Sequence, residues 1–87
     1  MAEDQYRTDD MCLVAVLCYE GHTAQRVVWE GGRDGKCYWH FDRIGNVVEI
    51  IESYFARAIR VEPREFNHTF GEVKKEFYRL LDKAKRG

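Results

Sequence analysis

Apolar and polar residues alternate along the chain with two different periods, and these periods predict where helices and strands lie. The longest apolar run covers residues 11–18; it follows three capping candidates, Thr8, Asp9 and Asp10, and precedes Gly21, a residue type that often ends a helix. Branched residues in this run also fit a buried strand. Because a cap lies before the run and a glycine after it, we favour a helix over roughly residues 9–19.

A β-hairpin is predicted in the middle of the chain. Residues 25–30 and 36–42 are rich in branched and aromatic residues, and the glycine-rich segment 31–35 separates them. Alternation along the strands assigns one set of side chains to a buried face: Val27, Trp29, Cys37, Trp39 and Phe41. The outward set is Lys36, Tyr38, His40 and Asp42. A two-stranded hairpin is not stable alone, so helices must cover its aromatic face.

Helical periodicity returns in the second half of the chain. Asn46 followed by Glu49 is typical of the capping box that begins a helix. The apolar positions that follow form a helical stripe: Val47, Val48, Ile50, Ile51, Tyr54, Phe55 and Ala58. Pro63, after Glu62, suits the first turn of a further helix, where its missing N–H costs nothing. The apolar positions of that helix recur every three or four residues: Phe66, Phe70, Val73, Phe77, Leu80 and Ala84. Gly71 lies inside this pattern and is expected to bend or break the helix, or to admit another backbone.

These elements follow one another as helix, hairpin, helix and helix, and predict an α+β fold in which helices cover one face of a small antiparallel sheet. The chain of 87 residues has room for one domain, residues 8–85, preceded by a flexible segment, residues 1–7. The composition, 45% apolar and 33% charged, is that of a globular protein. No apolar run reaches the ~18 residues of a membrane span, and the acidic start is unlike a secretory signal.

Neither a metal nor another cofactor is predicted. The chain has three cysteines, an odd number that favours free, mostly buried thiols in a reducing cytoplasm. Two pairs come closest to metal-ligand spacing, but Cys18 and His22 straddle a helix end, and Cys37 and His40 point to opposite faces of a strand. A set of four ligands at the required spacing does not exist.

Candidate catalytic groups are few. Cys12 lies in the first turn of the predicted helix, where the dipole favours a thiolate, but Asp9 and Asp10 in the same turn oppose that negative charge. Two pairs of carboxylates lie on the polar sides of their helices, where charges are solvated or paired: Glu49 with Glu52, and Glu72 with Glu76. The glycine-rich loop lacks the Lys-Ser/Thr ending of a phosphate loop. We therefore expect no enzymatic activity and assign no catalytic residue.

Charge and aromatic residues indicate binding surfaces instead. Residues 60–87 hold eight basic and five acidic side chains, whereas residues 1–30 hold two basic and six acidic ones. The candidate partner-binding residues lie on the outer hairpin face and the last helix: Arg26, Arg33, Lys36, Tyr38, His40, Lys74, Lys75 and Arg79. A fold this small buries one layer, so some of five rings are expected to stay accessible: Trp29, Tyr38, Tyr54, Phe55 and Tyr78. The net charge of −1 argues against a protein that coats nucleic acid. Two sets of charges on the last helix are expected to form helical ion pairs: Glu76 with Arg79, and Asp82 with Lys85.

A pattern of caps, core positions and turns runs through the chain: Thr8-x-Asp10, Leu13, Ala15, Leu17, Gly21-His22, the aromatic hairpin, Val61-x-Pro63-x-x-Phe66, Lys74-Lys75 and Phe77-Tyr78. Over residues 8–80 this pattern resembles a family of small phage- and prophage-associated domains that has no assigned function. The resemblance implies the fold and a mobile-element setting, and it carries over no catalytic residue. The loop 31–35 and the acidic start depart from the family's pattern.

Together, these features lead us to expect a non-enzymatic, phage-encoded module that binds a host or phage protein complex in the host cytoplasm. Obstruction of a host defence nuclease is one concrete form of this function. The module is expected to be a monomer or a homodimer, and the stripe of the last helix serves either the core or a partner helix. The alternative is an accessory protein of phage replication that binds single-stranded nucleic acid through the outer hairpin face and the last helix.

Overall fold

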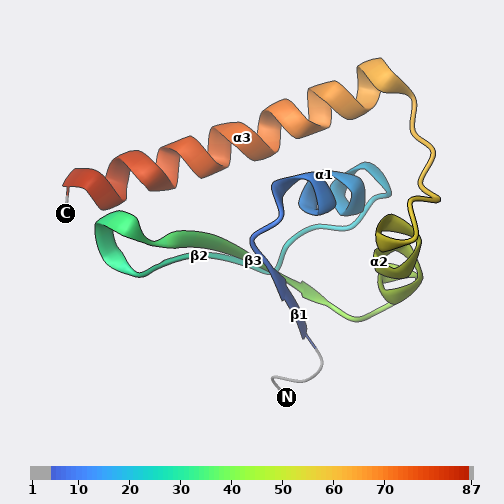
Figure 1. The fold of residues 1–87 in the computed structure, drawn as a ribbon, viewed down its shortest axis with the longest axis horizontal. Helices are drawn as coiled ribbons and strands as arrows, with labels where there is room; N and C mark the ends of the chain where they lie inside the picture. Colours follow the sequence, from blue (N-terminus) through green and yellow to red (C-terminus); the bar gives the residue numbers. More distant parts are fainter. Residues whose placement is uncertain (1–4, 87) are drawn as a thin grey trace.

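Helices pack on one side of a three-stranded antiparallel sheet in the computed structural model, which describes residues 5–86 (Figure 1). The elements in chain order are β1 (Gln5–Thr8), α1 (Met11–Tyr19), β2 (Arg26–Glu30), the 3₁₀ turn η2 (Gly32–Asp34), β3 (Lys36–Asp42), α2 (Val47–Phe55) and α3 (Pro63–Arg86). The strands are arranged in the order β1-β3-β2. This confirms the predicted α+β class and the hairpin, and it adds one strand in front of α1.

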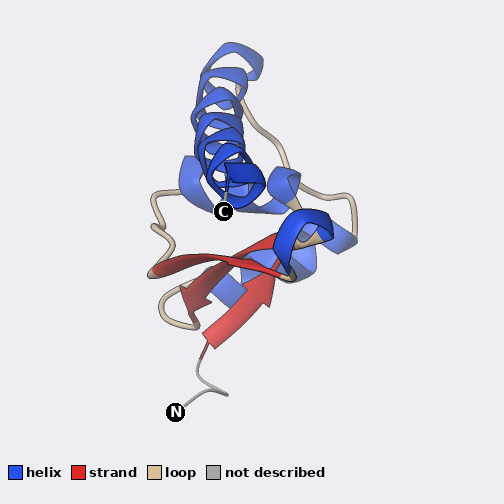
Figure 2. Ribbon diagram, turned by 90° about the vertical axis from the view of Figure 1, so that its left-hand side faces the viewer, coloured by secondary structure: helices blue, strands red, loops and turns tan. Residues whose placement is uncertain are grey.

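The covered face of the sheet is the one that the alternation predicted. α1 and α3 both lie above it, and α2 packs against α1 beside the end of β3 (Figures 1 and 2). The β3 side chains on this face, Cys37, Trp39 and Phe41, are only 1–3% exposed. Val27 and Trp29 of β2 pair with Trp39 and Cys37 and are packed against the same core.

β1 corrects the prediction for the start of the chain. Residues 5–7, which were expected to be flexible, belong to a strand on the free edge of β3, with Tyr6 opposite Phe41. A strand of four residues carries too little alternation to be detected in the sequence, and it forms because β3 offers unpaired backbone groups and Tyr6 packs against the core. Residues 1–4, the rest of the predicted flexible segment, lie outside the described residues.

α1 occupies the centre of the core. Residues Leu13–Leu17 are all at most 2% exposed, because α2 and α3 pack on the sides that the sheet leaves open. A helix surrounded in this way is apolar on all its faces, which explains why its sequence also fits a buried strand. Asp10 is the one of the three predicted capping candidates that begins the helix: its Oδ1 accepts hydrogen bonds from the backbone N–H groups of Cys12 and Leu13, at 3.0 and 3.2 Å. Asp9 and Asp10 therefore precede α1 and do not lie in its first turn, where they were expected.

α1 and α2 end in the same backbone motif, a Schellman turn closed by a residue in the left-handed conformation. After α1 this residue is Gly21, with φ +99°, as the sequence predicts. After α2 it is Arg57, with φ +59°. Glycine takes this conformation freely, whereas a side chain is strained there by about 1 kcal/mol.

Asn46 does not form the predicted capping box. It precedes α2, but its side chain makes no hydrogen bond to the N–H groups of that helix. Its Oδ1 lies 2.6 Å from Nε2 of His22 and ties the loop after α1 to the start of α2. A partner distant in sequence has therefore replaced the local one.

α3 is a single helix of 24 residues that crosses the whole molecule (Figure 1). Pro63 is its first residue, as predicted, and Glu62 caps it by accepting a hydrogen bond from the N–H of Glu65 at 2.8 Å. The helix continues through Gly71, and no other atom lies within 4 Å of the position of a Cβ there, so the glycine admits no second backbone. Most of the predicted stripe packs on the core: Phe66, Phe70, Val73, Phe77 and Leu80. Neither α3 nor any other helix within residues 5–86 is apolar enough over a sufficient length to cross a membrane.

Candidate functional site

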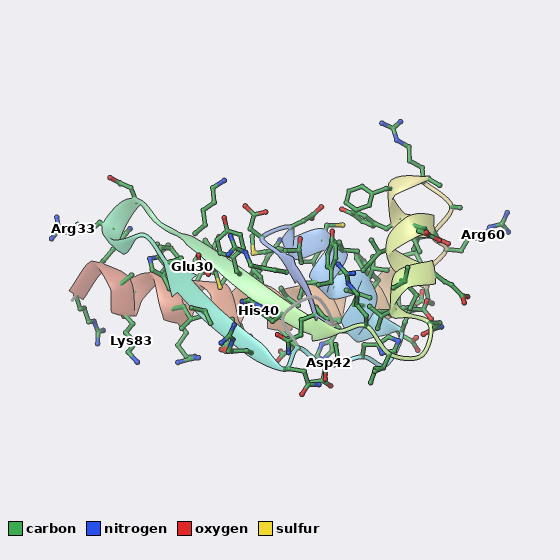
Figure 3. The ribbon with its side chains drawn as sticks, turned by 90° about the horizontal axis from the view of Figure 1, so that it is seen from below. Glu30, Arg33, His40, Asp42, Arg60 and Lys83 are labelled. Atoms are coloured by element: carbon green, nitrogen blue, oxygen red, sulfur yellow. The ribbon has the colours of Figure 1, made fainter. Side chains whose placement is uncertain are left out.

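The face of the sheet that points away from α1 and α3 carries charged and aromatic side chains (Figure 3). β3 runs along its middle, and the register places a residue of β1 or β2 beside each outward residue of β3. We call this surface the open sheet face; its members are Gln5, Arg7, Arg26, Val28, Glu30, Lys36, Tyr38, His40 and Asp42. It contains four of the eight predicted partner-binding residues.

His40 lies at the centre of this face but is buried, which corrects its prediction as an exposed stacking ring. It is only 7% exposed, because the strand missed in the sequence, β1, places Arg7 beside it while β2 places Arg26 on its other side. Burial, then the charges of Arg26 and Arg7, lower the pKa of His40 below its usual value, and Glu30 opposes this in part. The ring is therefore neutral at pH 7.

Tyr38 is half-buried beneath an arginine. The guanidinium carbon of Arg7 lies 3.8 Å from the centre of the Tyr38 ring, a cation–π contact. The same guanidinium approaches the carboxylate of Glu30 at 3.4 Å, and both side chains of that pair are about half exposed. Lys36, at the end of the face, is 3.4 Å from Asp9. These are weak surface contacts that a ligand can exchange for its own.

The structure separates the remaining predicted residues from this face. Lys74, Lys75 and Arg79 lie on α3, on the covered side of the sheet, and Arg33 lies in η2 at the hairpin tip (Figure 3). Lys75 pairs with Glu72 at 3.1 Å. The predicted pair of Glu76 with Arg79 is confirmed at 2.8 Å, whereas Asp82 pairs with Arg86 rather than with Lys85. Charges paired along a helix in this way are the ordinary solvated side of α3.

A surface that sequence analysis missed runs along α2. Ile44, Val48 and Phe55 are 62%, 44% and 62% exposed, and Tyr78 on α3 is the fourth large apolar or aromatic side chain exposed to this degree within residues 5–86. Val48 and Phe55 are seven residues apart and share a face of α2, and Ile44 lies in the loop three residues before this helix begins. We call these three residues the α2 stripe. The signal was present in the sequence, since apolar residues on α2 cover more of the helix than one core-facing side requires.

The five rings that were expected to stay accessible differ in their exposure. Phe55 and Tyr78 are exposed, as expected for some of the five, whereas Trp29 and Tyr54 are packed against the core. The ring of Trp29 lies 6.0 Å from that of Phe77, which fastens the hairpin to α3. The two most exposed rings therefore lie on α2 and α3, and Tyr38, half-buried beside Arg7, is the accessible ring of the hairpin.

The thiols are free, as the odd cysteine count predicted, and two of them are poor nucleophiles. Burial raises the pKa of the Cys18 thiol, and burial together with the carboxylate of Glu76 raises the pKa of Cys37 to about 11. Cys18 lines an apolar groove of about 310 Å³ between β2, α1 and α3. Within residues 5–86, no three His, Cys, Asp or Glu side chains are grouped to hold a metal ion.

Comparison with protein-family models, with curated proteins and with solved structures found no match.

Proposed function

We propose that this protein is a non-enzymatic interaction module that binds a host or phage protein complex through the α2 stripe. The observation that carries the proposal is the exposure of Val48 and Phe55 on one face of α2, with an exposed Ile44 in the loop that leads into this helix. Exposed apolar side chains are unremarkable when they are scattered, but two on one helix face, with a third just before the helix, form a candidate protein interface. The mobile-element setting and the host cytoplasm rest on the resemblance of residues 8–80 to phage-associated domains, and a host defence nuclease remains one concrete partner.

The free energy of binding that the α2 stripe can supply alone is limited. Burying the exposed parts of its side chains contributes about 1–2 kcal/mol for each, or about 4 kcal/mol together. A micromolar complex needs about 8 kcal/mol. The stripe is therefore the apolar centre of a wider interface, whose polar rim supplies the rest.

The charge on the stripe favours a different protein over a second copy of this chain. Glu52 is exposed and lies one turn from Val48 and from Phe55, near the middle of the stripe. In a two-fold dimer the central residues meet their own copies, so two Glu52 carboxylates would approach each other. A partner that presents an apolar patch with a nearby lysine or arginine avoids this repulsion.

The test is capture of the partner by matched variants. The tagged wild-type protein is expected to retain a stoichiometric protein from a host lysate, and the double variant Val48→Glu/Phe55→Glu is expected to lose it. Phe55→Glu alone is expected to weaken capture, and Tyr78→Glu is its control, because it places one carboxylate on an equally exposed ring of another helix. Circular dichroism checks that each variant is folded.

Two outcomes contradict the proposal. One is that no stoichiometric protein is retained, or that Tyr78→Glu weakens capture as much as Phe55→Glu. The other is that light scattering finds a wild-type dimer that the double variant converts to a monomer, which would assign the stripe to self-association.

A further inference from the structure

The centre of the open sheet face holds a polar atom without a partner. Within residues 5–86, Nε2 of His40 is buried and has no hydrogen-bond partner. Buried polar atoms in native proteins are nearly always paired, so an unpaired one needs an explanation, and a bound ligand is one such explanation. The ring is only 7% exposed, and its neighbours across the strands are two arginines, whose side chains are long and able to move.

Positive charge surrounds this atom. Arg26 forms no salt bridge with any residue that the structure describes, and Arg7 holds Glu30 only at 3.4 Å in an exposed pair. The register places Arg7 and Arg26 on either side of His40, so two guanidinium groups are within reach of its nitrogen and can supply several N–H donors to one ligand. A phosphate group, which accepts hydrogen bonds from guanidinium in pairs, fits this arrangement.

The aromatic and basic side chains beside Nε2 of His40 continue in one direction along β3, toward the hairpin tip. Tyr38 is two residues from His40, about 7 Å along the strand, and Lys36 and Arg33 follow toward the hairpin tip. At the other end, Asp42 accepts a hydrogen bond from Gln5 at 3.0 Å, and its negative charge marks the limit of the basic track. Three acidic groups lie beside the track: Glu30 approaches Arg7, Asp9 approaches Lys36, and Asp34 follows Arg33 in η2.

From this arrangement we propose that the open sheet face binds single-stranded nucleic acid, with one phosphate between Arg7, Arg26 and Nε2 of His40. A neighbouring base stacks on Tyr38 after Arg7 turns from the ring to the phosphate. The chain then runs along β3 toward Lys36 and Arg33. The site shares no residue with the α2 stripe, so this proposal and the proposed function stand or fall separately.

Tyr38 favours single-stranded nucleic acid over other anionic ligands of this site. An acidic peptide satisfies the guanidiniums but brings no flat ring to Tyr38. In a duplex the bases are already stacked inside the helix and are not free to pack on a side chain. An unpaired strand supplies both the phosphate and the accessible base.

Fluorescence anisotropy with matched variants tests the site. The probe is a labelled oligothymidine of about 12 nucleotides, titrated with the protein at about 50 mM salt and again at about 200 mM. Arg26→Glu is expected to weaken binding about tenfold and to flatten the salt dependence, because a phosphate contact is lost. Tyr38→Leu is expected to weaken it about fivefold or more, because stacking is lost.

Two controls make the same chemical changes on α3. Lys83→Glu reverses an exposed charge, and Tyr78→Leu removes an exposed ring; each is expected to leave the affinity within about twofold of wild type. A second readout is the ¹⁵N resonance of the His40 ring, whose Nε2 signal is expected to shift when the oligonucleotide is added.

Several results would overturn the proposal. Absence of binding at about 50 mM salt removes it. Equal losses of affinity in the two control variants would place the binding site on α3. Binding of thymidine monophosphate or of poly-glutamate as tight as that of the oligonucleotide shows that no strand is recognised, and an unmoved Nε2 signal at saturation removes His40 from the site.

Discussion

The hydroxyl of Tyr54 lies 3.2 and 3.0 Å from the two carboxylate oxygens of Asp10 and donates a hydrogen bond to them across 44 residues of sequence. The same carboxylate caps α1 through the N–H groups of Cys12 and Leu13. Burial, followed by hydrogen bonds with Cys12 and Asp10, raises the pKa of Tyr54 above its usual value, so its hydroxyl keeps its proton well above neutral pH. One side chain therefore both begins α1 and fastens α2 to it.

Replacing Tyr54 with phenylalanine tests this connection. Tyr54→Phe removes one hydroxyl and no apolar contact, and a hydrogen bond to a charged group contributes about 2 kcal/mol. Urea denaturation is expected to show a loss of that size in the free energy of unfolding. Tyr78→Phe removes an exposed hydroxyl from α3 and is expected to change it by less than about 0.5 kcal/mol. Equal effects of the two substitutions would contradict the structural role of Tyr54.

The two Schellman turns predict opposite effects of glycine. Arg57→Gly relieves the strain of φ +59° and is expected to raise the free energy of unfolding by about 0.5–1 kcal/mol. Gly21→Ala introduces that strain at φ +99°, where no atom lies within 4 Å of the new Cβ, so the expected loss of about 1 kcal/mol comes from the backbone alone. Thermal unfolding of both variants measures the two changes in the free energy of unfolding. Two changes of the same sign would show that the turns are not equivalent.

Local signals in the sequence predicted most of the elements. Asp10 and Gly21 bound α1, alternation gave the buried face of β3, and Pro63 marks the start of α3, because each signal acts within a few residues. Asn46 shows the limit of such signals. Its sequence neighbourhood fits a capping box, but His22 competes for its side chain, and that contact depends on how the loops meet in space.

The candidate surfaces were predicted less well, for the same reason. Alternation placed His40 on the outward face, but its burial depends on Arg7 of β1, a strand with too little pattern to be detected. Lys74 and Tyr38 were grouped by charge and ring chemistry, and the fold puts them on different sides of the sheet. Val48 was counted in the apolar stripe of its helix, and its exposure follows from which side of α2 meets α1.

Gly71 provides a test of the continuity of α3. A glycine inside a helix costs about 1 kcal/mol relative to alanine, and here the space around its Cα is open. Gly71→Ala is therefore expected to raise the free energy of unfolding by about 0.5–1 kcal/mol, measured by urea denaturation. A destabilised variant would mean that the helix needs the flexibility of glycine, or that another segment approaches it there.

His40 predicts how stability responds to acid. Its pKa in the folded protein lies below the ordinary value of 6.5, because burial, Arg26 and Arg7 disfavour the charged ring more than Glu30 favours it. The unfolded chain therefore takes up this proton at a higher pH than the folded protein, and the stability that the neutral ring provides above pH 6.5 is lost as the pH falls below it. His40→Gln keeps a polar side chain that does not titrate. Urea denaturation of both proteins between about pH 7 and pH 5 is expected to show a steeper fall for wild type, whereas parallel curves would mean that the ring titrates freely in the fold.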